Sequence, residues 1–130
     1  MLENYKLVFD DLPWFEAGDG MRYKRIQQGD TQLRLVEWDR AMVHANWCFK
    51  GHIGYVIEGE VEIDIAGKVF RYQPGDVFFI PEGEEHKHRP KVLSEKMRFF
   101  AVVLYPEVPA FYPVCPPFLA ETSPLWSLFS

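Results

Sequence analysis

The chain has 130 residues, of which 48% are hydrophobic, 16% aromatic and 25% charged, and its formal net charge is −5. This length suits one globular domain that buries a core without disulfide or metal staples. An acidic chain without clustered Lys and Arg argues against nucleic-acid binding. No apolar run approaches the roughly 18 residues that a membrane span needs, so we expect neither nucleic acid nor membrane as a partner.

The N-terminal residues and the cysteines give an indication of the cellular compartment. The first residues, 1–6, lack the charged-then-apolar layout of a secretory signal, which favours a cytoplasmic protein. The two cysteines, Cys48 and Cys115, are too few for a disulfide framework. We therefore expect both to remain reduced.

Short β-rich runs, separated by turns rich in Gly, Pro and Asp, follow one another along the chain. Residues 33–38 and 61–65 alternate in polarity, which predicts strands with one wet face. Residues 77–80 and 99–104 are continuous apolar runs, which predict strands buried on both faces. Because no segment has a sustained helical period, we predict an all-β sandwich or barrel over about residues 20–105.

The last quarter of the chain has a different composition. Between residues 106 and 130, six prolines are interleaved with aromatic residues. Proline removes the N–H groups that a sheet needs, yet the segment is too aromatic for a plain disordered tail. We expect an extended strap, laid over the barrel or over a partner subunit. Because such a strap would be an exposed apolar patch in a monomer, we predict a homodimer.

A family signature lies in the middle of the chain. Gly75, Pro81, Gly83 and His86 match the pattern G-x5-P-x-G-x2-H. This run resembles the second signature of the cupin superfamily, and the fifteen residues between Gly59 and Gly75 resemble the spacing of small cupins. The resemblance implies an all-β cupin-type β-barrel, also described as a jelly roll or double-stranded β-helix.

The first cupin signature, H-x-H-x3-E-x6-G, is only half present. Gly59 is in place, but His52 stands where the family has its Glu, and Asn46 and Cys48 stand where it has its two histidines. In the family, these positions and the histidine after the Pro-x-Gly turn usually hold a metal ion in the barrel mouth. The resemblance thus implies a single cupin domain over residues 1–130, with a rewritten metal site.

Four residues are candidate metal ligands. His44, Cys48 and His52 share one strand parity and could face one cavity, and His86 would join them from the opposing strand. Imidazole and thiolate groups suit a divalent transition metal such as Zn, Fe, Ni or Mn. Alternatively, the two signature histidines are neutral, hydrogen-bonded pocket residues, His44 caps the rim, and Cys48 is a small buried hydrophobe.

The sequence also predicts the positions of other residues near the two signatures. His88 shares the parity of His86 but lies between Lys87 and Arg89, so we expect it to be exposed. The residues expected to line a ligand pocket are Asn46, Trp47, Tyr55 and Phe79.

These features predict a small cupin that binds a divalent metal, a small polar molecule, or both, in its barrel. A metal with an open coordination position could polarise a carbonyl or activate water, which makes a metal-dependent enzyme of unknown reaction one candidate. The alternative is a metal-free cupin that binds or senses a small ligand without catalysis, and the missing Glu and H-x-H pair favour it. A third candidate is a subunit whose strap serves assembly alone. The fold by itself does not decide among them.

Overall fold

The computed structural model describes residues 5–42 and 46–104. Within these ranges the chain forms nine strands and a short 3₁₀ helix, η1. The elements are β1 (Phe15–Gly18), β2 (Met21–Gln28), β3 (Thr31–Asp39), β4 (His52–Glu58), β5 (Val61–Ile65), β6 (Lys68–Tyr72), β7 (Val77–Ile80), η1 (Glu84–His86), β8 (His88–Val92) and β9 (Lys96–Leu104).

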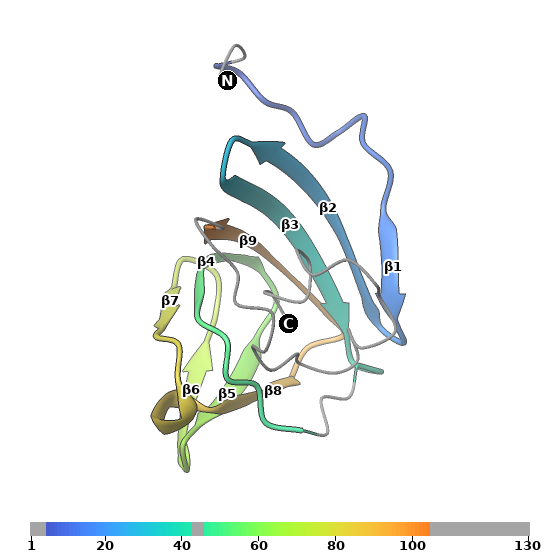
Figure 1. Cartoon of the computed structure of the whole chain (residues 1–130). Coiled ribbons are helices and arrows are strands. Elements are labelled where there is room, and N and C mark those ends of the chain that lie inside the picture. The colour runs from blue at the N-terminus through green and yellow to red at the C-terminus, as the bar shows by residue number, and fades with distance from the viewer. Residues whose placement is uncertain (1–4, 43–45, 105–130) are drawn as a thin grey trace.

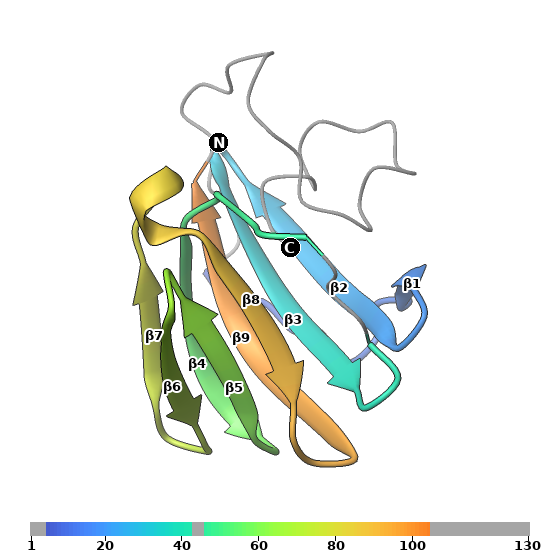
Figure 2. The ribbon, with the colours of Figure 1, turned by 90° about the horizontal axis from the view of Figure 1, so that it is seen from below.

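The strands form two antiparallel sheets. The larger sheet has the order β1-β2-β3-β9-β4-β7, and the smaller has the order β6-β5-β8. Figure 1 shows the two sheets enclosing one interior, and in Figure 2 strands β8 and β5 lie over β9 and β4. The all-β fold predicted from the sequence is confirmed. The predicted strap over residues 106–130 lies outside the described residues.

The core fills the space between the two sheets. Phe99 of β9 is 1% exposed, and its ring meets Trp38 and Phe78 edge to face, with centroids 4.8 and 5.2 Å away. Edge-to-face contacts add to the free energy gained from burying the rings. The prediction that β7 is buried on both faces is wrong, because Val77 and Phe79 are 61% and 69% exposed.

The N-terminal segment packs on the outer face of the larger sheet. Phe9 meets Phe100 of β9 with ring centroids 6.4 Å apart, and Lys24 of β2 donates a hydrogen bond from Nζ to the Phe9 carbonyl at 3.1 Å. Farther along, Trp14 receives the guanidinium of Arg22 over its ring at 4.1 Å. The chain thus covers the outer face over β2 and β9 with its own residues.

A buried carboxylate on this face ties three strands together. Glu37 of β3 accepts hydrogen bonds from Arg22 Nε at 2.6 Å and from Arg98 Nε at 2.9 Å. Burial by itself raises the pKa of Glu37, but the hydrogen bonds and charges of the two guanidinium groups outweigh it and leave the pKa below the ordinary value of 4.5. A carboxyl group with a lowered folded-state pKa stabilises the protein at neutral pH.

We expect Glu37→Gln to destabilise the fold at pH 7 by about 1–2 kcal/mol, a value reduced by the partial exposure of both arginines. In the wild type, the contribution of Glu37 is present above pH 4.5 and is lost as the pH falls through the lowered pKa. Urea unfolding between pH 7 and pH 3 measures the free energy of unfolding of both proteins, and the difference between them should disappear in acid. A difference that stays constant over that range would contradict the prediction.

Candidate metal centre

A short backbone bridge brings two chemically active residues side by side. Cys48 and His88 form an isolated antiparallel pair. Cys48 N donates to the His88 carbonyl at 2.9 Å, and His88 N donates to the Cys48 carbonyl at 3.0 Å. Because both bonds of the pair are made, the two Cα atoms are held close and the side chains start from neighbouring positions.

His52 completes a cluster of three donors. It is the first residue of β4, and its Nε2 lies 3.7 Å from Cys48 Sγ. The imidazole rings of His52 and His88 meet edge to face with centroids 4.7 Å apart. The candidate ligand atoms of Cys48, His52 and His88 all lie within 4.8 Å of one another, and the three residues are 0%, 6% and 3% exposed.

These separations suit a metal centre. With metal–ligand bonds of about 2.0–2.3 Å, the ligand atoms of a tetrahedral zinc site lie ~3.5 Å apart. The Cys48–His52 distance of 3.7 Å matches this spacing, and a movement of about 1 Å would bring the widest separation into range. Three ligands would leave one position open, as in catalytic zinc sites.

The orientation of the His88 ring is set by the turn before β8. His88 Nδ1 lies 3.1 Å from the His86 carbonyl oxygen. Since a carbonyl can only accept, Nδ1 carries the proton of this hydrogen bond. In the neutral ring, Nε2 then has the lone pair that binds a metal, and the bond to the carbonyl holds the ring in place.

The sulfur of Cys48 has a second possible role. Cys48 is disulfide-bonded in the structure, so the prediction that it remains reduced is wrong; Cys115 lies outside the described residues. The thiolate, not a disulfide sulfur, is the strong metal ligand. Cys48 therefore becomes a ligand only when the disulfide is reduced.

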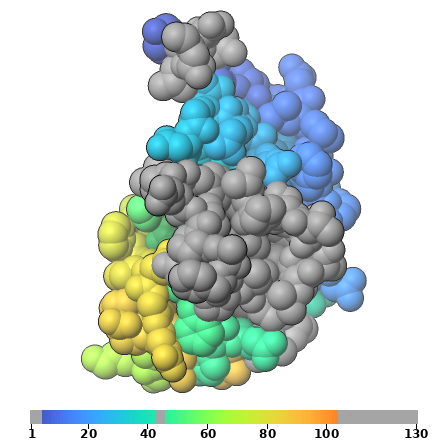
Figure 3. All heavy atoms as spheres, in the orientation of Figure 1, coloured from blue at the N-terminus to red at the C-terminus, as the bar shows by residue number. Residues whose placement is uncertain are grey.

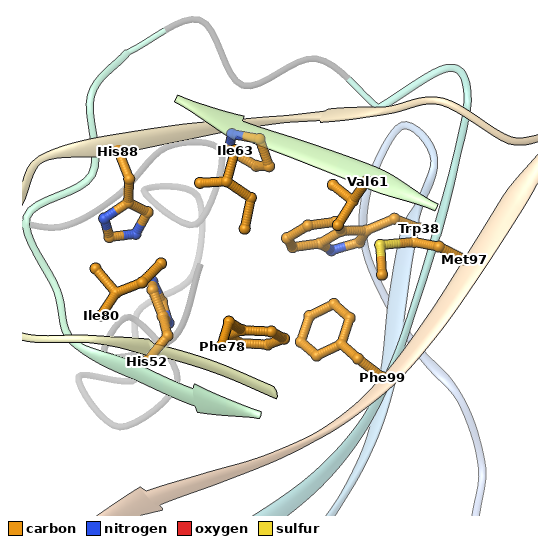
Figure 4. Close-up of a pocket in the computed structure, with 10 residues that line it drawn as sticks. Trp38, His52, Val61, Ile63, Phe78, Ile80, His88, Met97 and Phe99 are labelled. Atoms are coloured by element: carbon orange, nitrogen blue, oxygen red, sulfur yellow. The ribbon is translucent and has the colours of Figure 1, made fainter. Parts of the chain in front are cut away.

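Two members of the cluster, His52 and His88, line one end of a cavity between the sheets. The cavity has a volume of about 350 Å³, of which ~20 Å³ is open to the centre of a water molecule, enough for about one water. In Figure 4, the rings of His52 and His88 point toward each other at one end, and Trp38, Met97 and Phe99 lie at the other. The lining residues are Trp38, His52, Val61, Ile63, Phe78, Ile80, His88, Pro90, Met97 and Phe99.

His52 also lines a second, more open pocket of about 660 Å³, together with residues from the ends of β4, β7 and β9. Glu82 lines the same pocket, and it favours the charged form of Lys50. Lys50 is 2% exposed; burial lowers its pKa to about 8, and Glu82 acts in the opposite direction. The segment between Cys48 and His52 thus holds a buried, largely protonated amine at pH 7.

The structure separates the four candidate ligands of the sequence analysis. It brings Cys48 and His52 together, and it places His86 at the end of η1, outside the three-donor cluster. His44 lies outside the described residues. The prediction that His88 is exposed is wrong, because this residue is 3% exposed and faces the cavity.

The four predicted pocket residues do not line the cavity. Asn46 is exposed, and the ring of Trp47 lies beneath Lys87 and Arg89, whose charged groups are 4.8 and 4.1 Å from its centroid. Tyr55 and Phe79, 48% and 69% exposed, lie on the outer face of the larger sheet. Phe79 lines the second, more open pocket beside His52, whereas core residues and the two buried histidines line the cavity between the sheets.

A sequence signal for His88 was present. Residues 87 and 89 are cationic and alternate with His88, and in a strand such neighbours point to one face while the residue between them points to the other. The signature histidine, His86, is the last residue of the 3₁₀ helix η1 (Glu84–His86). Strand β8 begins two residues later, at His88. The histidine that points into the barrel is therefore His88 and not His86.

The fold is a small antiparallel barrel in which two histidines converge between the sheets. The family model for the cupin domain matches residues 42–103, which span the three-donor cluster. Together with the fold, this places the chain in the cupin superfamily.

Several solved structures have a similar fold. KdgF from Halomonas sp. is 23% identical with a TM-score of 0.64, covering 73% of this chain and 87% of that one. An RmlC-like cupin from Shewanella frigidimarina is 17% identical with a TM-score of 0.61, covering 77% and 89%. A sugar phosphate isomerase of the cupin superfamily from Silicibacter pomeroyi is 18% identical with a TM-score of 0.58, covering 75% and 73%. At these identities the likeness concerns the fold.

No curated protein matches the chain in sequence. Among the described residues, no helix has the length and apolar character needed to cross a bilayer.

Proposed function

We propose that this chain is a cupin that binds a divalent transition metal through Cys48, His52 and His88, and that it binds or transforms a small polar molecule at that metal. The observation that carries the proposal is the convergence of three buried donors within 4.8 Å of one another, two of which line one end of an otherwise apolar cavity.

The donor set favours zinc. One thiolate and two imidazoles form a borderline-soft site, which suits Zn(II) and, next, Fe(II) or Ni(II), and suits Mn(II) least. A bound metal would supply Lewis-acid polarisation of an oxygen at its open position. The chain's own residues would orient the ligands, since the His86 carbonyl holds the His88 ring, and the apolar walls would limit water to about one molecule.

Two features support a small, polar and preferably anionic ligand. The space beside the cluster is small, so a bulky molecule would reach it only with one end, through the open pocket at His52. Lys50, a buried cationic residue, lies in the same segment of the chain as Cys48 and His52. The closest chemical class is a small molecule with a carboxylate, carbonyl or hydroxyl oxygen that can meet the metal.

The second candidate function is that of a metal-free binding cupin. The disulfide at Cys48 favours it, because the oxidised protein offers only two imidazoles. In that state the same cavity would hold a small ligand by apolar contact and by hydrogen bonds to the histidines.

Metal analysis separates the two functions. We expect untagged protein, reduced and then reconstituted, to retain about one equivalent of zinc, and unreduced protein to bind it much more weakly. If neither form retains zinc, iron, nickel or manganese after dialysis, the metal-binding function is refuted and the metal-free function stands.

The cobalt-substituted protein tests the sulfur ligand. We expect reduced wild type to have a thiolate-to-cobalt charge-transfer band, and Cys48→Ser to lose that band. Since loss of an outer-shell partner alone costs 10–100-fold in affinity, loss of this ligand should weaken metal binding by at least ~100-fold. An unchanged spectrum in the variant would place Cys48 outside the coordination sphere.

A further inference from the structure

Two arginines are direct neighbours on the inner face of the larger sheet. Arg25 of β2 pairs with Arg34 of β3 in the antiparallel ladder, so their Cβ atoms lie ~5 Å apart. Arg34 has the same strand parity as Trp38, which lines the cavity between the sheets. Arg34 is 0% exposed, and Arg25 is half-buried. Two cationic side chains therefore start side by side on the face that points into the barrel.

A chain of hydrogen bonds holds the side chain of Arg34. Its Nε donates to Gln32 Oε1. Gln32 Nε2 in turn donates to Gln27 Oε1 at 2.9 Å, and Gln27 Nε2 donates to the Gly29 carbonyl at 2.9 Å. The Arg34 Cζ lies 4.4 Å from the centre of the Tyr23 ring. The bond to Gln32 uses one of the five N–H donors of the guanidinium, and these contacts fix the position of the group, as a binding site requires.

The two arginines concentrate positive charge on this face. Glu37 of β3 has the opposite parity and forms its ion pairs with arginines of the outer face. In the part of the chain that the structure describes, Arg25 lies 5.3 Å from the centre of the Phe15 ring and forms no ion pair. Like charges directly opposite each other destabilise a sheet. An anion bound between Arg25 and Arg34 would remove this repulsion.

The arginine pair lies to one side of the smaller sheet. Figures 1 and 2 both show β1 and β2 beside that sheet. In Figure 3, the blue and cyan residues up to β2 lie at the top and right of the molecule, away from the lime and yellow residues of β5–β7 at the lower left. Arg25 is half-buried and Gln27 is exposed, so an anion would approach the pair from the side of β2.

The same inner face continues to the three-donor cluster. Arg34 pairs with Ala101 of β9, and Ala101 pairs with Gly54 of β4. His52 lies two residues before Gly54, on the same face of β4. With strands ~4.8 Å apart and a rise of ~3.4 Å per residue, the Cα atoms of Arg34 and His52 are roughly 12 Å apart. This separation, less the length of the two side chains, suits one small molecule with two polar ends.

We propose that Arg25 and Arg34 form an anion subsite that binds a carboxylate group of a small molecule whose other end meets the three-donor cluster. A guanidinium fork matches a carboxylate through two parallel hydrogen bonds. The close packing around Arg34, where Tyr23, Gln32 and Ala101 are 6%, 1% and 0% exposed, suits a flat carboxylate better than a tetrahedral phosphate. The second half of the proposal rests on the proposed function, whereas the subsite itself requires no metal.

Calorimetric titration of the full-length, chelator-treated protein with succinate tests the subsite without metal. At pH 7 and low ionic strength, we expect wild type to bind succinate more tightly than inorganic phosphate. Arg34→Gln and, separately, Arg25→Gln should each weaken succinate binding by ~10–100-fold, the effect of losing a charged hydrogen-bond donor. The matched control is Arg71→Gln on β6, which removes the same charge from an exposed residue of the smaller sheet, and it should keep the wild-type affinity.

Far-UV circular dichroism establishes that each variant is folded, and Arg25→Gln, at the half-buried position, decides if Arg34→Gln is not. The subsite is overturned if wild type binds succinate more weakly than ~10 mM, or if Arg25→Gln and Arg71→Gln bind it equally well. Tighter binding of phosphate than of succinate overturns the carboxylate assignment. A wild type that binds succinate but retains no zinc supports the subsite and refutes only the metal-bound end of the ligand.

Discussion

In the His88→Ala protein, zinc affinity is expected to fall by at least ~100-fold, while His86→Ala protein keeps the affinity of the reduced wild type. His88 contributes one of only three donors, and each lost ligand must be replaced by water. His86 matches the family signature, yet it serves the site through its carbonyl oxygen, which accepts the hydrogen bond from His88 Nδ1. Alanine at position 86 keeps that carbonyl.

A competition titration against a zinc chelator, on reduced protein at pH 7, measures the zinc dissociation constants of both variants. His52→Ala should behave like His88→Ala, because its Nε2 faces the Cys48 sulfur at 3.7 Å. Circular dichroism and urea unfolding of the metal-free proteins separate lost ligation from lost structure. If His86→Ala abolishes zinc binding and His88→Ala does not, the signature histidine is the ligand and the proposed centre is incorrect.

Replacing Gly59 with alanine is expected to destabilise the fold by about 2–5 kcal/mol. Gly59 has a φ of +83°, and a Cβ there would lie 2.1 Å from the Lys96 carbonyl oxygen and 2.6 Å from Met97 Cα. The left-handed backbone costs ~1–2 kcal/mol for an L-residue, and the overlap with backbone atoms that cannot rotate away adds ~1–3 kcal/mol or more.

Gly67→Ala is the matched control for this substitution. Gly67 has a similar φ of +95° in the turn between β5 and β6, but a Cβ there would meet nothing within 4 Å. We therefore expect this variant to lose only ~1–2 kcal/mol, the cost of the backbone conformation. Urea unfolding at 25 °C gives both values. Equal losses in the two variants would mean that the contact between Gly59 and β9 contributes nothing.

Several features of the fold could be predicted from the sequence because they depend on local geometry. The turn glycines and the alternation in residues 61–65 predicted an antiparallel, all-β chain, and β5 forms at Val61–Ile65 as expected. Gly59 and the Pro81-x-Gly83 turn carried the family resemblance. Gly59 is required because its backbone is left-handed and in contact with β9.

The composition of a strand did not determine which of its faces is buried. Polarity suggested an exposed His88, but its cationic neighbours stack on Trp47 outside the barrel and leave the histidine inside. On β3, Arg34 is 0% exposed, with its guanidinium 4.4 Å from the centre of the Tyr23 ring. On β7, Phe79 is exposed although it lies in a wholly apolar run.

The sequence by itself therefore determined the class of fold, the turns and two of the three proposed donors, Cys48 and His52, because these follow from residue spacing along single segments. The tertiary structure alone decided the third donor and the two faces of β4 and β7. His88 enters the cluster through η1 and through a backbone bridge to Cys48, forty residues away. Long-range pairing of this kind sets which side of a strand meets the core, and a shift of one residue would exchange the two faces.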